Sequence, residues 1–247
     1  MLHCKKSACA FLDILTAAGL RSGDYRAPDP AEVARREAER RAEAQRKAEQ
    51  ARRLWREARP AEGGPAEAYL HARGIRLERL PAVLRFHPEA WHGPTARRWP
   101  AMLAAVAGAG LPAVHRTYLR PDGSGKAEVD PAKAMLGGTA GGAVRLTDGP
   151  GPLLVGEGIE STLAAWTLRG DATARAWAAL STSGLRGLRL PPQPGRLCIA
   201  ADGDAAGIGA AHALAERAHA LGWQVTIAQP PAGADWADVL TGKAVAA

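Results

Sequence analysis

From residue 149 onward, short runs rich in apolar residues alternate with amphipathic stretches. The apolar runs predict four strands, and the amphipathic stretches predict helices at 160–169 and 206–221 and a last helical turn at 235–240. The predicted strands cover 153–155, 175–180, 197–201 and 224–228. Strands that are apolar on both faces and alternate with helices are typical of a parallel sheet with helices on both sides. We therefore expect residues 149–247 to form an α/β domain, a Rossmann-like parallel four-stranded sheet with flanking helices.

Residues 28–62 show a different pattern. The stretch 31–58 lacks glycine and proline, consists of good helix formers, and carries nine basic and six acidic side chains. It has no apolar stripe before Leu54 and Trp55. These features predict a long solvated helix that links two parts of the chain, with a helix lying on nucleic-acid phosphates as the alternative.

Residues 63–148 predict a small basic α+β subdomain. A short helix is expected over 65–73, closed by Gly74, and strands are expected over 101–107 and 113–119. Basic residues and several glycines follow the second strand. Glycines at this density bring the backbone close to a ligand or form loops.

Residues 1–27 hold Cys4 and Cys9, followed by a short apolar helix pattern that ends at Gly19. With Cys198 the chain has three cysteines, which cannot form a disulfide framework, so we expect a reducing cytoplasm. No apolar run reaches the roughly 18–20 residues that span a bilayer. Asp13 interrupts the apolar stretch, so a signal peptide of normal form is absent and no membrane partner is expected.

The formal net charge of +7 is unevenly spread. Residues 1–150 carry 25 basic and 17 acidic side chains, whereas residues 151–247 carry 7 basic and 8 acidic ones. The excess of positive charge favours nucleic acid as a partner, and its division suggests two parts with different roles.

Acidic side chains follow three of the four predicted strands. They are Glu157, Asp202, Asp204, Asp235 and Asp238. Since ligands bind beyond the carboxyl ends of the strands in an open parallel sheet, these carboxylates should meet at one edge. Each motif alone could be an ordinary turn, but the ordered set favours a site for Mg²⁺ or Mn²⁺ that acts on phosphates.

These motifs resemble the Toprim domain of DnaG-type bacterial primases, topoisomerases and related nucleases. The match lies in Glu157-Gly158, in Asp202-Gly203-Asp204 with a following Gly207, and in the pair Asp235 and Asp238. The resemblance implies that Asp202 and Asp204 bind Mg²⁺ and that Glu157 is a further ligand or a general acid or base. The sequence departs from the primase pattern at Ser161, where that pattern has aspartate, and in the Asp-x-x-Asp spacing of the last pair.

The resemblance extends upstream, to the basic subdomain that precedes Toprim in bacterial primases. It is carried by 69–75, 84–88 and the basic segment from His115 to Arg145. It implies that template or nucleotide phosphates bind to Arg116, Lys126, Lys133 and Arg145. Two tryptophans, Trp91 and Trp99, flank a pair of arginines, a pattern that suits either base stacking or core packing.

The N-terminus is similar to the second half of a primase zinc ribbon. Because zinc needs four ligands, Cys4 and Cys9 form an incomplete site. We therefore expect Zn²⁺ only if the true start lies upstream and supplies the remaining pair.

Together these features predict four domains: a zinc-ribbon remnant (1–27), a charged helical linker (28–62), a basic primase-like subdomain (63–148) and a Toprim catalytic domain (149–247). The expected activity is a metal-dependent, primase-like nucleotidyltransferase that makes RNA primers on single-stranded DNA from nucleoside triphosphates for a plasmid or phage. A Toprim nuclease and a non-catalytic nucleic-acid-binding replication protein stay open as alternatives. The sequence has no Walker loop, so a replicative helicase partner would be another chain.

Overall fold

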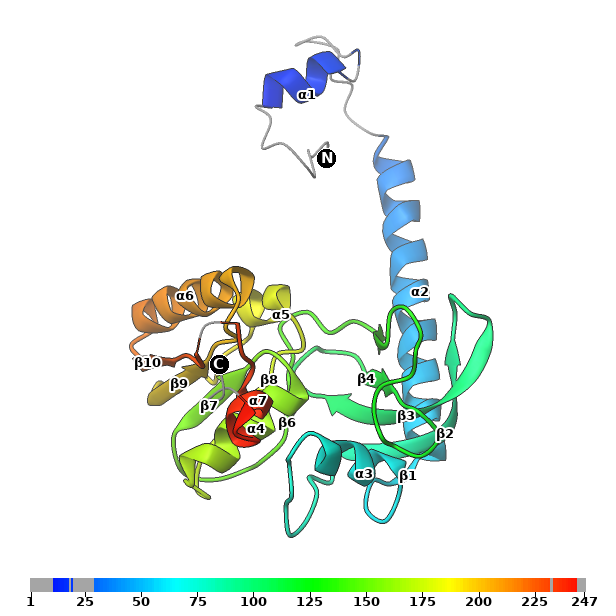
Figure 1. Cartoon of the computed structure of the whole chain (residues 1–247). Coiled ribbons are helices and arrows are strands. Elements are labelled where there is room, and N and C mark those ends of the chain that lie inside the picture. Colours follow the sequence, from blue (N-terminus) through cyan, green and yellow to red (C-terminus); the bar gives the residue numbers. More distant parts are fainter. Residues whose placement is uncertain (1–10, 18, 20–28, 232, 244–247) are drawn as a thin grey trace. The chain divides into compact units, whose positions relative to one another are not determined.

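The computed structural model describes residues 11–17, 19, 29–231 and 233–243 (Figure 1). The chain divides into two compact units, residues 1–43 and residues 44–247. The first unit holds α1 (Phe11–Ala17) and the beginning of α2 (Pro30–Glu57). The predicted helix before Gly19 is thus confirmed. Cys4 and Cys9 lie outside the described residues.

Helix α2 has the solvated character that its composition predicts. Of its 28 residues only Ala48 and Ala51 are buried. Its exposed surface carries ion pairs one turn apart, such as Arg36 with Glu32 at 2.5 Å, which contribute a few tenths of a kcal/mol each. Leu54 and Trp55, in the last turns of the helix, pack against buried residues of the second unit.

The upstream part of the second unit is built on an antiparallel sheet of five strands. In sheet order the strands are β1 (Arg59–Pro60), β2 (Leu84–His92), β3 (Arg97–Val106), β4 (Ala113–Tyr118) and β5 (Lys133–Leu136). Helix α3 (Pro65–Ala72) follows β1. The predicted strands at 101–107 and 113–119 are confirmed as β3 and β4, and β2 and β5 add to them.

The two faces of this sheet contact different elements. Directly paired residues of an antiparallel sheet point to the same face. Leu103, paired with Arg116, packs with Tyr118 against Leu54 near the end of α2. Met102, paired with Thr117, packs instead with Tyr69 of α3. Neighbouring residues along β4 therefore serve opposite sides of the sheet.

The C-terminal part is a second five-stranded sheet, in the order β10-β9-β7-β8-β6. Its strands are β6 (Val144–Arg145), β7 (Leu153–Gly156), β8 (Arg175–Ala178), β9 (Arg196–Ala200) and β10 (Gln224–Ala228). The four predicted strands are mutually parallel, which confirms the expected sheet. One strand was missed, because β6 is only two residues long and joins the edge antiparallel to β8.

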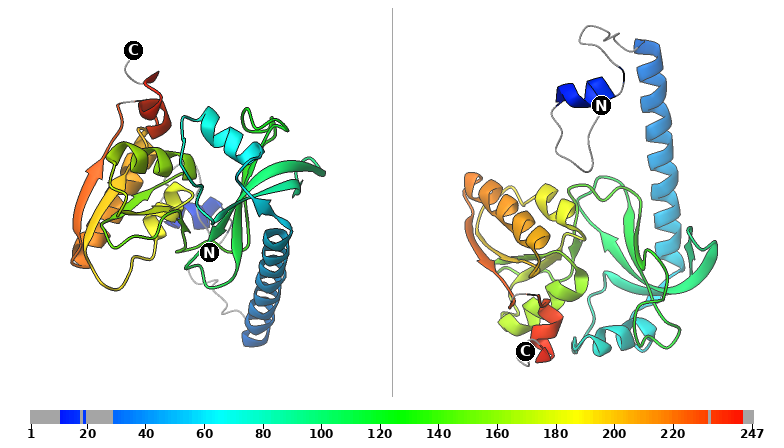
Figure 2. Two further views of the ribbon diagram at one scale, coloured as in Figure 1. Left: turned by 90° about the horizontal axis from the view of Figure 1, so that it is seen from below. Right: turned by 45° about the horizontal axis from the view of Figure 1, so that its top comes forward.

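Helices cover both faces of the second sheet (Figure 2). They are α4 (Ile159–Arg169), α5 (Thr182–Gly187), α6 (Ala205–Ala220) and α7 (Trp236–Leu240). Leu163 of α4 packs on Ala176 and Cys198 from one side. Leu214 of α6 packs on Val155 from the other side. This is the α/β doubly wound arrangement that the sequence predicts. No helix within the described ranges combines the length and apolar character needed to cross a membrane.

Candidate active site

The carboxyl ends of β7 and β9 bring three predicted site residues to one edge of the second sheet. Glu157 directly follows β7, and Asp202 and Asp204 follow β9, its parallel neighbour. Burial raises the pKa of Glu157, and the charges of Asp202 and Asp204 raise it further. The three carboxylates therefore share one electrostatic environment, as expected of groups that a cation would stabilise.

Asp202 is the most constrained of the three. Burial raises its pKa, the Ser161 side chain partly offsets this effect, and Asp235 and Asp204 raise the pKa again. Its Oδ1 is buried and has no hydrogen-bond partner. Since a buried polar atom without a partner is costly, this oxygen is suited to accept a cation or a ligand donor.

The remaining aspartates also cap helices. Asp204 Oδ1 accepts a hydrogen bond from the Gly207 backbone N–H at 2.6 Å at the start of α6. Asp235 and Asp238 form a reciprocal capping box at the start of α7. Arg73, which ends α3, forms an ion pair with the Asp235 carboxylate. Asp235 and Asp238 thus already have structural partners within the protein.

A preformed metal cluster is not seen in the part of the chain that the structure describes, where no three His, Cys, Asp or Glu side chains lie together in a suitable arrangement. The five-carboxylate metal site stays a prediction. The three residues after β7 and β9 remain the ones whose electrostatics favour a cation.

One charged group at this edge was missed by sequence reasoning. Glu160, in the first turn of α4, is only 4% exposed. It accepts hydrogen bonds from the Tyr69 hydroxyl at 2.6 Å and from Lys133 Nζ at 2.9 Å. Burial alone would raise its pKa, but the Lys133 ammonium and the Tyr69 hydrogen bond outweigh this and hold the pKa well below its usual range. Glu160 therefore joins α3, β5 and α4 as a buried anion.

Two of the four predicted phosphate-binding residues lie on this side of the first sheet. Lys133 is close enough to lower the pKa of both Glu157 and Asp202. Burial lowers the pKa of Lys126, and the charge of Lys133 lowers it further. A cavity of about 320 Å³ opens beside Lys126, lined also by Arg73, Ser124 and Tyr69. The structure thus places basic groups next to the acidic edge.

The other two predicted residues point elsewhere. Arg116 is paired with Ala134, whereas Lys133 is paired with Thr117, so the two basic side chains leave opposite faces of the sheet. Arg145, on β6, lies over the ring of Trp177 at 4.6 Å. The four basic residues do not form a single site.

Two family models match this chain in succession. Residues 45–146 match a domain of unknown function (DUF7146), and residues 152–245 match the Toprim domain. No curated protein matches the chain.

Solved structures of bacterial primases are similar to it at low identity. The RNA polymerase domain of Mycobacterium tuberculosis primase DnaG shares 17% identity, with 81% of this chain and 79% of that chain covered and a TM-score of 0.45. The Aquifex aeolicus primase, with its zinc-binding and RNA polymerase domains, shares 13%, with 94% and 62% covered and a TM-score of 0.49. A DNA primase domain from Pseudomonas aeruginosa shares 19%, with 65% and 52% covered and a TM-score of 0.38. The chain thus spans about half of the Pseudomonas structure.

The match over 152–245 includes all five carboxylates predicted from the sequence as well as Glu160, and the fold of this region is the expected doubly wound sheet. The chain therefore carries a C-terminal Toprim domain, preceded by a domain of the DUF7146 family.

Proposed function

We propose that this chain is a primase-like nucleotidyltransferase that makes short RNA primers on single-stranded DNA. One observation carries the proposal: Lys133 Nζ of the upstream sheet lies 2.9 Å from Glu160 Oε2, in the first turn of the Toprim helix that follows Glu157. Carboxylates for a cation beside ammonium groups for phosphates are the combination that phosphoryl transfer from a nucleoside triphosphate needs.

A divalent cation, Mg²⁺ or Mn²⁺, would be held by Glu157, Asp202 and Asp204. The fit rests on the buried Asp202 Oδ1, which has no partner, and on hard carboxylate oxygens of the kind these ions prefer. The cap at α6 uses one oxygen of Asp204 and leaves the other available. When bound, such an ion neutralises phosphate charge and favours deprotonation of the attacking hydroxyl.

The basic groups of the chain would hold the triphosphate. Glu160 fixes the Lys133 ammonium through one hydrogen bond, and an ammonium has two further donors to offer to phosphate oxygens. Lys126 adds a second cation at the neighbouring cavity. Glu160 acts here as a positioning residue, because it holds Lys133 and its own oxygens are already engaged.

The test is ribonucleotide incorporation on a single-stranded DNA template with Mg²⁺ or Mn²⁺. Asp202→Asn and Asp204→Asn remove the charge, and asparagine at position 204 keeps the helix cap. We expect both variants to lose incorporation and to bind Mn²⁺ more weakly in titration calorimetry. Glu216→Gln, on the exposed surface of α6, is the matched control and should behave as wild type.

Two results would overturn the proposal. Incorporation that survives the loss of both Asp202 and Asp204 would exclude the assigned carboxylates. Metal-dependent cleavage of labelled DNA or RNA without any incorporation would instead identify a nuclease, in which the same carboxylates activate water.

A further inference from the structure

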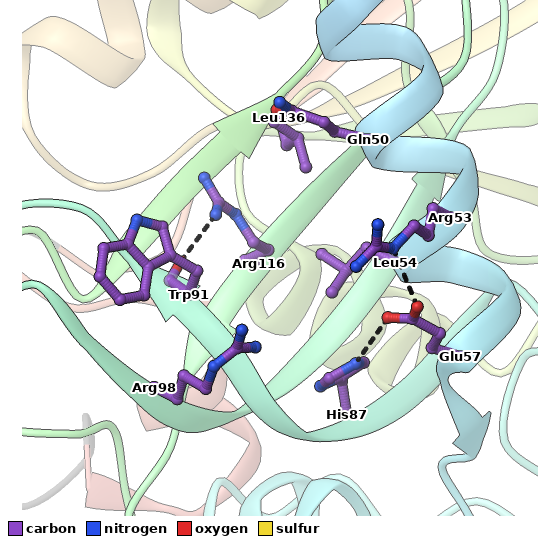
Figure 3. A pocket seen from close by; sticks show the side chains of 9 residues that line it. All are labelled: Gln50, Arg53, Leu54, Glu57, His87, Trp91, Arg98, Arg116 and Leu136. Atoms are coloured by element: carbon purple, nitrogen blue, oxygen red, sulfur yellow. Dashed lines mark hydrogen bonds and ion pairs between the residues drawn. The ribbon is translucent and has the colours of Figure 1, made fainter.

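A second cavity, of about 340 Å³, lies between the last turns of α2 and the first sheet (Figure 3). Trp91 and Arg98 line it from β2 and β3, and Arg53 lines it from α2. Arg116 of β4 also lines the cavity. The volume falls within the range of small-molecule pockets.

This cavity lies across the sheet from the acidic edge. Arg116 shares a face with Leu103 and Ala134, and this face packs against α2. Lys133, which contacts Glu160, leaves the opposite face. The cavity is therefore separate from the acidic edge and from the proposed active site.

Trp91 gives the cavity an aromatic wall. Its side chain is 49% exposed, whereas Trp99 packs against the cluster around Leu103. The backbone beneath Trp91 is held in place, because its carbonyl accepts hydrogen bonds from the Tyr118 hydroxyl at 2.6 Å and from Arg116 Nη1 at 2.9 Å. An exposed ring on a fixed backbone is a ready stacking surface, since little further ordering is needed when a base binds.

The charge of the cavity is positive. Three arginines line the cavity together with a single carboxylate, that of Glu57, which already lies 3.0 Å from Arg53 and 3.7 Å from His87. Arg98 and Arg116 donate hydrogen bonds to backbone carbonyls, which orient the guanidinium groups but do not neutralise them. Arg116 Nε is buried and has no hydrogen-bond partner, and the guanidinium lies over the Tyr118 ring at 5.7 Å. An anion at this point would gain charge-assisted hydrogen bonds.

We propose that this cavity binds one nucleotide unit of a single-stranded nucleic acid. The base stacks on Trp91, and the adjoining phosphate binds at Arg98 and Arg116. Leu54 and Leu136 supply the apolar contact for the base and sugar. The proposal rests on the proposed function for the identity of its ligand, and it adds a second contact point on the opposite face of the sheet.

The experiment measures binding of a fluorescein-labelled oligodeoxythymidine to the full chain by fluorescence anisotropy, in EDTA and without nucleotides. Trp91→Ala should raise the Kd roughly 5- to 100-fold, the range expected when one stacked base is lost. Trp91→Phe keeps an aromatic face and should retain most of the affinity. Leu221→Ala, at a side chain that is 56% exposed beyond α6, is the control and should leave the Kd unchanged.

Arg98→Ala tests the phosphate contact separately. It should weaken binding and reduce the salt dependence of log Kd by about one unit of slope. An unchanged Kd in Trp91→Ala would overturn the proposal, as would free mononucleotide competing as strongly as the oligonucleotide. Because the measurement involves no turnover, an inactive wild-type protein with Trp91-dependent binding would refute only the primase assignment.

Discussion

The buried contact between Tyr69 and Glu160 offers the sharpest test of how the two halves of the second unit hold together. The perturbation is a double-mutant cycle of Tyr69→Phe, Glu160→Gln and the combined variant. Tyr69 is 1% exposed and Glu160 is 4% exposed, and their oxygens lie 2.6 Å apart. Phenylalanine fills nearly the same volume as tyrosine, so the first variant removes little besides the hydroxyl.

The expected magnitude follows from this geometry. A hydrogen bond to a charged, buried acceptor contributes about 1.5–3 kcal/mol. The Lys133 side chain is 36% exposed, so water can solvate it after the charge of Glu160 is removed, and its share of the loss should be small. We expect each single variant to lower the free energy of unfolding by about 2–3 kcal/mol. The combined variant should lose less than the sum by about 1.5–3 kcal/mol.

Urea unfolding of the four proteins, followed by circular dichroism, measures the coupling. Tyr118→Phe provides the control cycle, because its hydroxyl is also buried in a 2.6 Å hydrogen bond but lies on the α2 face of the sheet. The stability losses of Tyr118→Phe and Glu160→Gln should be additive in the combined variant. If the stability losses of Tyr69→Phe and Glu160→Gln are additive within about 0.5 kcal/mol, the Tyr69 hydroxyl does not stabilise the buried Glu160 anion.

Two further predictions concern single residues. Burial lowers the pKa of His115 to about 4. Between pH 6.5 and 4 the unfolded chain therefore binds a proton at this histidine, whereas the folded chain does not. Wild type should therefore lose about 3 kcal/mol of stability between pH 6.5 and 4, and His115→Gln should show a flatter profile in urea unfolding at stepped pH; equal slopes would contradict this. Gly123 has a φ of +73°, and a Cβ there would lie 2.3 Å from the Pro65 carbonyl oxygen. Gly123→Ala should lower the melting temperature far more than Gly63→Ala, whose φ of +71° is similar but whose Cβ would meet nothing within 4 Å.

The strands of the Toprim domain could be predicted closely because each is a short run rich in apolar residues, and these runs alternate with helical patterns. The run at 224–228 is reproduced to the residue as β10. The upstream sheet was harder. In β2 the pairing register shifts between His87 and Ala90, and the intervening Pro88 argues against a strand. Local pattern does not reveal such an irregular strand.

Only those site residues that directly follow a strand could be predicted from the sequence. Glu157, Asp202 and Asp204 could be placed together because parallel neighbours end at the same edge. The partners of Glu160 could not, since Tyr69 lies 91 residues away and no local pattern pairs them. Likewise, the sequence shows Arg116 and Lys133 as two basic residues in one segment, and only the pairing register separates their faces.

Because side chains alternate along β4, this one strand contributes to two different environments, one on each face of the sheet. Thr117 is paired with Lys133 on the acidic side, and its neighbour Arg116 belongs to the side of α2. Deleting one residue within 113–118 would exchange the two sets of side chains, so that a guanidinium would face the carboxylates and the buried histidine would face the charged helix. Natural variation in this strand should therefore proceed by substitution, because a change of length by one residue would disturb the packing on both faces of the sheet at once.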